Sequence, residues 1–147
     1  MVRELGFDAC VDYKAGKLYE ELKAACPEGI DCYFENVGGE VMDTVFRQLN
    51  AFSRVALCGM ISEYNLTEPY GMKMLRALLV NRVKLQGFIV SDRMDLYARA
   101  IQHLGKAVAQ GKIKYRETLA QGLESAPKAF IGMLKGENLG KQLVKVA

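Results

Sequence analysis

The sequence predicts an α/β fold in which an incomplete, doubly wound parallel sheet is followed by a strand-helix-strand tail. Short apolar runs alternate with segments whose apolar residues recur at helical spacing. One run, Arg54 to Met60 (RVALCGM), is almost continuously apolar, as expected of a strand buried on both faces of a parallel sheet. This alternation predicts parallel strands joined by right-handed crossovers.

The first part of the chain is predicted as strand-helix cycles that follow a helix end at Val2 to Gly6. In the first helix Leu18, Leu22 and Ala25 share one face, because they recur at helical spacing. The elements expected here are the strands Phe7 to Tyr13, Ile30 to Glu35 and Arg54 to Met60, and the helices Lys17 to Cys26 and Gly39 to Leu49.

The second part begins with a polar loop, Ile61 to Tyr70, and ends in the tail. Gly111 and Gly136 are expected to terminate helices, since glycine adopts the left-handed conformation of a helix end. The expected helices are Lys73 to Val80, Asp95 to Gln110 and Gly122 to Lys135, and the expected strands are Lys84 to Val90, Ile113 to Leu119 and Gly140 to Val146. Residues 1–112 are predicted as one partial domain and residues 113–147 as a tail of another domain.

Composition and charge argue against nucleic-acid binding, a membrane span and a metal site. The 147 residues are 50% hydrophobic, enough for one sizeable core. The 20 basic residues are scattered among 17 acidic ones, so nucleic acid is not an expected partner. No apolar run approaches the roughly 20 residues of a membrane span, and the four cysteines and the one histidine lack metal-site spacing. A cytoplasmic protein with reduced thiols and no metal site is predicted.

The segment Ile30 to Glu40 (IDCYFENVGGE) is the most informative stretch. An apolar strand stops at Asn36, and a Gly38-Gly39 pair leads into a helical pattern. Parallel sheets bind ligands at the carboxyl ends of their strands, and paired glycines let a ligand approach the backbone. A nucleotide site is therefore one interpretation, and an ordinary strand-to-helix turn is the other.

Several segments, in order along the chain, resemble the zinc-independent medium-chain reductases. They are VDYK (Val11 to Lys14), YFENVGGE (Tyr33 to Glu40), ALCGMISEYN (Ala56 to Asn65), LQGFIV (Leu85 to Val90) and GLESAPKAFIGMLKGENLGKQLVKV (Gly122 to Val146). Within that superfamily the chain is most similar to the carboxyl-terminal portion of the NADPH-dependent alkenal/one reductases, the prostaglandin- and curcumin-reductase group. The resemblance implies an incomplete Rossmann-like sheet.

The resemblance also implies the site residues. Tyr64 is the candidate for contact with the substrate, although a loop tyrosine that only packs is an alternative. Tyr13 has the alternative of a half-buried strand-end aromatic, and Asn138 that of a helix C-cap. The implied NADPH contacts are Tyr13, Asn36, Gly38, Cys58, Gly59, Ile61, Ser62, Phe88, Ile89, Val90 and Asn138.

The implied reaction is hydride transfer from NADPH to the carbon-carbon double bond of an α,β-unsaturated aldehyde or ketone. However, the Gly-x-Gly-x-x-Gly turn that holds a dinucleotide's pyrophosphate is missing from the sequence. We therefore expect this chain, read as a fragment or a shortened reading frame, to bind NADPH weakly and to be inactive alone. The alternatives are a noncatalytic fragment that only self-associates, for instance as a homodimer through Lys84 to Val90, and an unrelated doubly wound domain such as a methyltransferase.

Overall fold

The computed structural model describes residues 2–146, and these divide into two compact units. One unit consists chiefly of Phe7–Asp95. The other combines Arg3–Gly6 with the chain from Leu96 onward. The division falls within the first turn of the long helix α5 (Met94–Ala109).

The first unit is built on a three-stranded parallel sheet in the order β1-β2-β3. Its strands are β1 (Ile30–Glu35), β2 (Leu49–Leu57) and β3 (Lys84–Gly87). The register pairs Glu35 with Leu57 and Leu57 with Gly87, so the three strands end side by side. The loops that follow them therefore emerge at one edge of the sheet.

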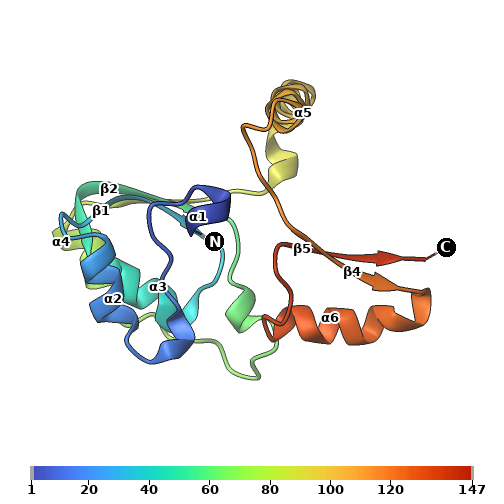
Figure 1. Cartoon of the computed structure of the whole chain (residues 1–147). Coiled ribbons are helices and arrows are strands. Elements are labelled where there is room, and N and C mark those ends of the chain that lie inside the picture. Colours follow the sequence, from blue (N-terminus) through green and yellow to red (C-terminus); the bar gives the residue numbers. More distant parts are fainter. Residues whose placement is uncertain (1, 147) are drawn as a thin grey trace. The chain divides into compact units, whose positions relative to one another are not determined.

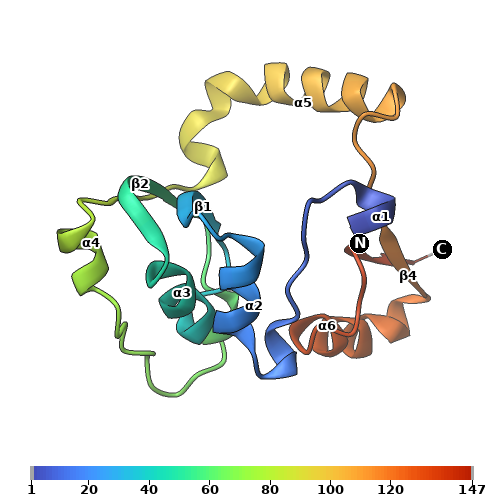
Figure 2. The same cartoon turned by 60° about the vertical axis from the view of Figure 1, so that its left-hand side comes forward.

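Helices α2 (Leu18–Ala25) and α3 (Gly39–Phe46) lie against the same face of this sheet (Figures 1 and 2). The core between them consists of Met42, Val45, Phe46, Leu49 and Val55. Phe46 is fully buried, and the short helix α4 (Arg76–Val80) adds Ala77 and Leu78 at the margin. Burial of this apolar stripe against the sheet stabilises the two helices.

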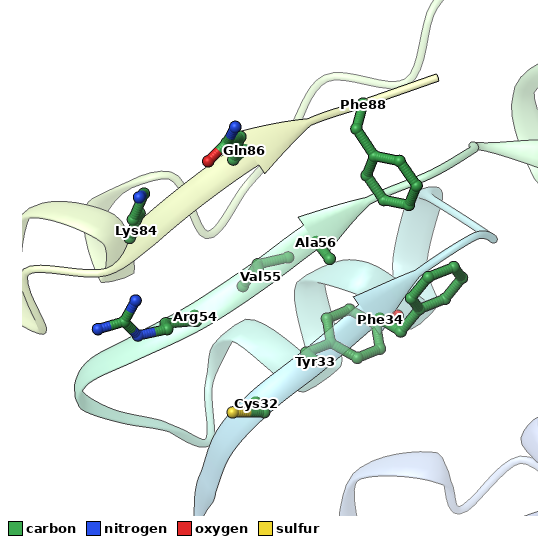
Figure 3. A pocket seen from close by; sticks show the side chains of 9 residues that line it. All are labelled: Cys32, Tyr33, Phe34, Arg54, Val55, Ala56, Lys84, Gln86 and Phe88. Atoms are coloured by element: carbon green, nitrogen blue, oxygen red, sulfur yellow. The ribbon is translucent and has the colours of Figure 1, made fainter. Parts of the chain in front are cut away.

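The opposite face of the sheet is exposed and forms a shallow hollow of about 590 Å³ (Figure 3). Phe34 and Phe88 meet edge to face there, with ring centroids 6.0 Å apart, yet Phe34 is 60% exposed. The side chains that line this face include Cys32, Phe34, Arg54, Ala56, Lys84, Gln86 and Phe88.

The second unit contains most of α5, the parallel strands β4 (Glu117–Gln121) and β5 (Lys141–Lys145), and α6 (Ala126–Leu134). Gly111, at φ +67°, ends α5, as predicted, and its amide donates to the carbonyl of Val108 over 2.9 Å. The Arg116 guanidinium pairs with Glu4 of the short helix α1 (Val2–Leu5). Within residues 2–146, no helix is both long and apolar enough to cross a membrane.

The predicted strand Phe7 to Tyr13 is wrong: residues 6–12 are irregular, and Tyr13–Ala15 form a 3-10 turn. The Asp12 carboxylate accepts from the Lys14 amide over 2.9 Å, and the Asp12 carbonyl accepts from Ala15. Such local bonds compete with a strand ladder, and β1 pairs only with β2 in the described chain. The segment therefore does not form a strand.

The other predicted elements exist, most of them with shifted ends. β1 has the predicted bounds, and α2, α5 and β5 are close to theirs. α3 ends at Phe46, before the predicted Leu49, so β2 begins at Leu49 instead of Arg54. β3 stops at Gly87, and residues 90–93 form a 3-10 turn in which the Asp92 carboxylate accepts from the Ile89 amide over 3.0 Å. β4 starts at Glu117, four residues after the predicted Ile113.

Candidate functional site

The turn after β1 has a backbone that requires glycine. Gly38 adopts φ +79° and ψ −165°, a region almost confined to glycine, and it precedes the first turn of α3. A Cβ atom at Gly38 would also lie 2.8 Å from Glu63 Oε1 and 3.0 Å from Met60 Cβ. The glycine therefore permits both the turn and the close approach of the loop after β2.

That loop is bonded directly to the turn. The amide of Ile61 donates to the carbonyl of Asn36 over 3.3 Å, and both the amide and the hydroxyl of Ser62 donate to the carbonyl of Val37, over 2.9 and 2.6 Å. In return, the Gly39 amide donates to the Glu63 carboxylate over 3.3 Å. The residues predicted from the two strand tips are thus brought together.

Asn36 and Tyr64 both lie over Gly59. A Cβ atom placed on Gly59 would be 2.6 Å from Asn36 Oδ1 and 3.2 Å from the Tyr64 hydroxyl oxygen. Both side chains are exposed, Tyr64 by 67%. Within residues 2–146 neither polar group has a side-chain hydrogen bond. An amide and a phenol are therefore available to a ligand at one point.

A hollow of about 500 Å³ opens between the tips of β2 and β3. It combines exposed backbone and apolar surface with the Tyr64 phenol and one carboxylate, that of Asp92. This lining suits a neutral polar ring better than a phosphate, because it contains no lysine or arginine. Its residues are Leu57, Cys58, Gly59, Met60, Tyr64, Gly87, Phe88, Ile89 and Asp92.

Seven predicted site residues do not line this hollow: four belong to the bonded turn and loop, Asn36, Gly38, Ile61 and Ser62, and the other three are Tyr13, Val90 and Asn138. Val90 follows the hollow and is 73% exposed. Tyr13 is in the 3-10 turn, not at a strand tip, with the Lys14 ammonium 5.8 Å from its ring centroid. Asn138 belongs to the other unit, where its amide donates to the Gly140 carbonyl over 2.7 Å. The C-cap of α6 is Lys135, so the helix-cap alternative for Asn138 is wrong.

Sequence reasoning overlooked Glu35, the last residue of β1. Its side chain is fully buried and accepts hydrogen bonds from the Val37 amide over 2.5 Å, the Gly38 amide over 2.9 Å and the Tyr33 hydroxyl over 2.9 Å. Burial, together with the Glu35 carboxylate, raises the pKa of Tyr33. The available signal was an acidic residue closing an apolar strand just before paired glycines.

Metal binding has no geometric support in the described chain. Among residues 2–146, no group of three or more histidine, cysteine, aspartate and glutamate side chains is arranged to hold a metal ion.

Comparison with known proteins places this architecture in a family. Residues 1–106 match the family model described as "Zinc-binding dehydrogenase". The chain is 46% identical over 149 residues to the NADPH-dependent curcumin reductase of Escherichia coli, covering 97% of this chain and 43% of that protein. It is 42% identical over 145 residues to the NADP(+)-dependent 2-alkenal reductase of Nicotiana tabacum, covering 98% and 42%.

A solved structure of a related protein resembles this chain in fold as well as in sequence. The NADPH complex of CurA from Vibrio vulnificus superposes with a TM-score of 0.91 and 49% identity, covering 99% of this chain and 45% of that one. The chain thus spans less than half the length of these relatives, and the part it matches is carboxyl-terminal. The chain therefore belongs to the zinc-binding dehydrogenase family and, within it, is similar to the carboxyl-terminal part of NADPH-dependent curcumin and 2-alkenal reductases.

Proposed function

We propose that the chain is the nicotinamide-side, carboxyl-terminal portion of an NADPH-dependent oxidoreductase that reduces the carbon-carbon double bond of α,β-unsaturated aldehydes and ketones. The observation that carries this proposal is the convergence of the Asn36 amide and the Tyr64 hydroxyl over Gly59, at the tips of parallel strands. Similarity to an NADPH complex and to a 2-alkenal reductase supports it.

The donor set fits the nicotinamide half of the cofactor. Asn36 offers a donor and an acceptor. The amides of Cys58, Gly59, Phe88 and Ile89 already donate within the chain, so the backbone from Cys58 to Gly59 and from Phe88 to Val90 would contribute mainly carbonyl acceptors, without introducing charge. When bound, NADPH would supply the hydride. Gly38, Ile61 and Ser62 would keep the backbone of the turn and of the loop in place.

Tyr64 is the residue we assign to the substrate. Its exposed hydroxyl can donate a hydrogen bond to the substrate carbonyl, whose oxygen gains negative charge as hydride is added to the β-carbon of the conjugated double bond. The enolate so formed would then take up a proton at its α-carbon, which completes the reduction. Cys58 contributes backbone instead of a nucleophile. Orientation of the alkene and stabilisation of this oxygen are the two contributions required of the protein.

We further propose that NADPH binds weakly to this chain alone. The chain lacks a Gly-x-Gly-x-x-Gly turn, so a helix N-terminus for the pyrophosphate is not provided by these residues. We also propose that Tyr13 and Asn138 contact NADPH. We propose, in addition, that the protein is cytoplasmic and forms a homodimer. The rest of the substrate pocket would come from the part of the relatives that this chain does not match.

A chimera tests the catalytic proposal. We would replace the matched part of Vibrio vulnificus CurA with this chain and measure NADPH-dependent reduction of an enone. We expect activity in the chimera and a loss of about tenfold or more in kcat on Tyr64→Phe, because one hydrogen bond to a charged oxygen is lost. Tyr19→Phe is the matched control, since Tyr19 lies on α2, away from the hollow. An inactive but folded, NADPH-binding chimera would refute the proposal.

The exposed sheet face favours a second candidate function, self-association of a noncatalytic fragment. Phe34 is 60% and Phe88 39% exposed on a face that no helix of this unit covers. Sedimentation velocity of the purified chain tests this candidate. A monomer at all concentrations would remove it, whereas a dimer that Phe34→Ser dissociates would support it.

A further inference from the structure

We propose that Glu35 is a positioning residue of the cofactor site: its buried carboxylate holds the turn that aims the Asn36 amide over Gly59. This inference rests on the proposed function for its consequence in binding. The geometry itself is independent of that function, because it consists of hydrogen bonds within the chain.

A carboxylate in this position is costly unless its partners stay in place. Glu35 is 0% exposed, and among residues 2–146 no lysine or arginine forms an ion pair with it. Its charge is met only by hydrogen-bond donors, and Oε1 takes two backbone amides, those of Val37 and Gly38. Rotation of either peptide plane would leave a buried charge with fewer donors. The carboxylate therefore selects one conformation of the turn.

That conformation decides where Asn36 lies, since Asn36 sits between Glu35 and the two bonded amides. While the Val37 and Gly38 amides point at the buried carboxylate, the Asn36 side chain is exposed and its oxygen approaches Gly59. Glu35 thus acts on the ligand through Asn36 and touches no ligand itself.

Glu35 also sets the spacing between the two strand tips. Its main-chain carbonyl accepts from the amides of Cys58 and Gly59, over 2.8 and 3.2 Å. The side chain therefore controls the turn after β1, while the carbonyl of the same residue anchors the start of the loop after β2. The turn that carries Asn36 and the loop that carries Tyr64 are therefore both hydrogen-bonded to Glu35.

Three variants of the full chain separate positioning from general stability. Glu35→Gln keeps the shape but replaces the charged acceptor of the two amides. Tyr33→Phe removes the third hydrogen bond of the same carboxylate and leaves the amide bonds intact. Val55→Ala lowers stability from the core, where Val55 is 2% exposed, and leaves the donors of the Glu35 carboxylate in place.

Two NMR readouts are recorded for each variant. The first is hydrogen exchange of the Val37 and Gly38 amides relative to amides of α3. The second is the affinity for reduced nicotinamide mononucleotide, a probe without the adenosine half, followed by chemical-shift titration. Because charge-assisted bonds are roughly twice as strong as neutral ones, we expect Glu35→Gln to accelerate exchange of both amides and to weaken the probe by about fivefold or more. Tyr33→Phe and Val55→Ala should change the probe affinity by less than about twofold.

Unchanged exchange of Val37 and Gly38 in Glu35→Gln would overturn the inference, as would equal losses of affinity in all three variants. If the unmodified chain bound no probe, the same three variants would be titrated in the CurA chimera, and a folded chimera that bound neither the probe nor NADPH would refute the proposed function. The amide exchange would then still decide whether Glu35 holds the turn.

Discussion

The carboxylate of Asp43 on α3 holds the loop that precedes α4, and its replacement should open that loop. Asp43 is 5% exposed and accepts hydrogen bonds from the Tyr70 hydroxyl over 2.7 Å, the Lys73 amide over 3.1 Å and the Met74 amide over 2.9 Å. Met72 and Met74 of this loop pack against the core of the first unit. The network therefore links a charged group to apolar packing.

The expected loss of stability in Asp43→Ala follows from the hydrogen bonds that the Asp43 carboxylate accepts. Asp43→Ala leaves three donors without an acceptor, and each such buried group costs about 1–3 kcal/mol. Because Lys73 is exposed and Tyr70 half-buried, water can satisfy part of this loss, and we expect a destabilisation of about 2–4 kcal/mol. Asp43→Asn keeps one oxygen for the Lys73 and Met74 amides and should cost about 1 kcal/mol.

The contribution of the Asp43 carboxylate to the stability of the first unit should depend on pH. Burial would raise the pKa of Asp43, but the hydrogen bonds from Tyr70, Met74 and Lys73, with the Lys73 charge, outweigh burial and lower it. A carboxyl whose pKa is lower when folded contributes its full stability above its unfolded pKa of about 3.9 and loses it as the pH falls through the folded value. The difference in stability between wild type and Asp43→Asn should therefore shrink on acidification below about pH 4.

Urea-dependent hydrogen exchange of the α3 amides measures the stability of the first unit in wild type and in the Asp43 variants, because it reports opening of that unit. Asp95→Asn is the control, since Asp95 pairs with Arg93 on the surface, both side chains being at least 60% exposed, and should change stability by less than about 1 kcal/mol. Equal stability of wild type and Asp43→Ala at pH 7, or a difference from Asp43→Asn that does not vary with pH, would refute the reasoning.

Three further substitutions should separate stability from binding. Gly38→Ala should destabilise the first unit by about 1–3 kcal/mol, measured by urea denaturation, because of its positive φ and the 2.8 Å approach to Glu63; an unchanged midpoint would contradict this. Gly59→Ala should change stability by less than about 1 kcal/mol, because only side-chain ends oppose the new methyl, yet it should displace Asn36 and weaken the nicotinamide probe in NMR titration. Phe46→Ala should cost about 3–5 kcal/mol, visible as lost helical circular dichroism, whereas loss below about 1 kcal/mol would exclude Phe46 from the core.

The predicted fold class is confirmed because its signals are local and repeated. The helical spacing on α2 and α3 predicts one packed face on each helix, and the structure packs Leu22 of α2 and Val45 and Phe46 of α3 against the sheet. The expectation that the run Arg54 to Met60 is buried on both faces is wrong: β2 buries Ser53 and Val55 on the helix side, while Arg54 on the opposite face is exposed, because no helix of this unit covers that face. The segment at residues 7–13 misled this reasoning, since its apolar residues match a strand. A strand needs a partner for its backbone, and the Asp12 turn bonds its own backbone instead.

The sequence by itself determined the parallel α/β architecture, the strand-tip position of Asn36 and the glycine pair, and, through its ordered resemblances, the family that the comparisons confirm. Only the tertiary structure decided that the Tyr64 hydroxyl and the Asn36 amide meet over Gly59, and that a buried Glu35 joins both loops. The physical reason is that periodicity records which side of an element is apolar. It does not record which loops meet in space, because that depends on strand register and on hydrogen bonds between residues far apart in the chain.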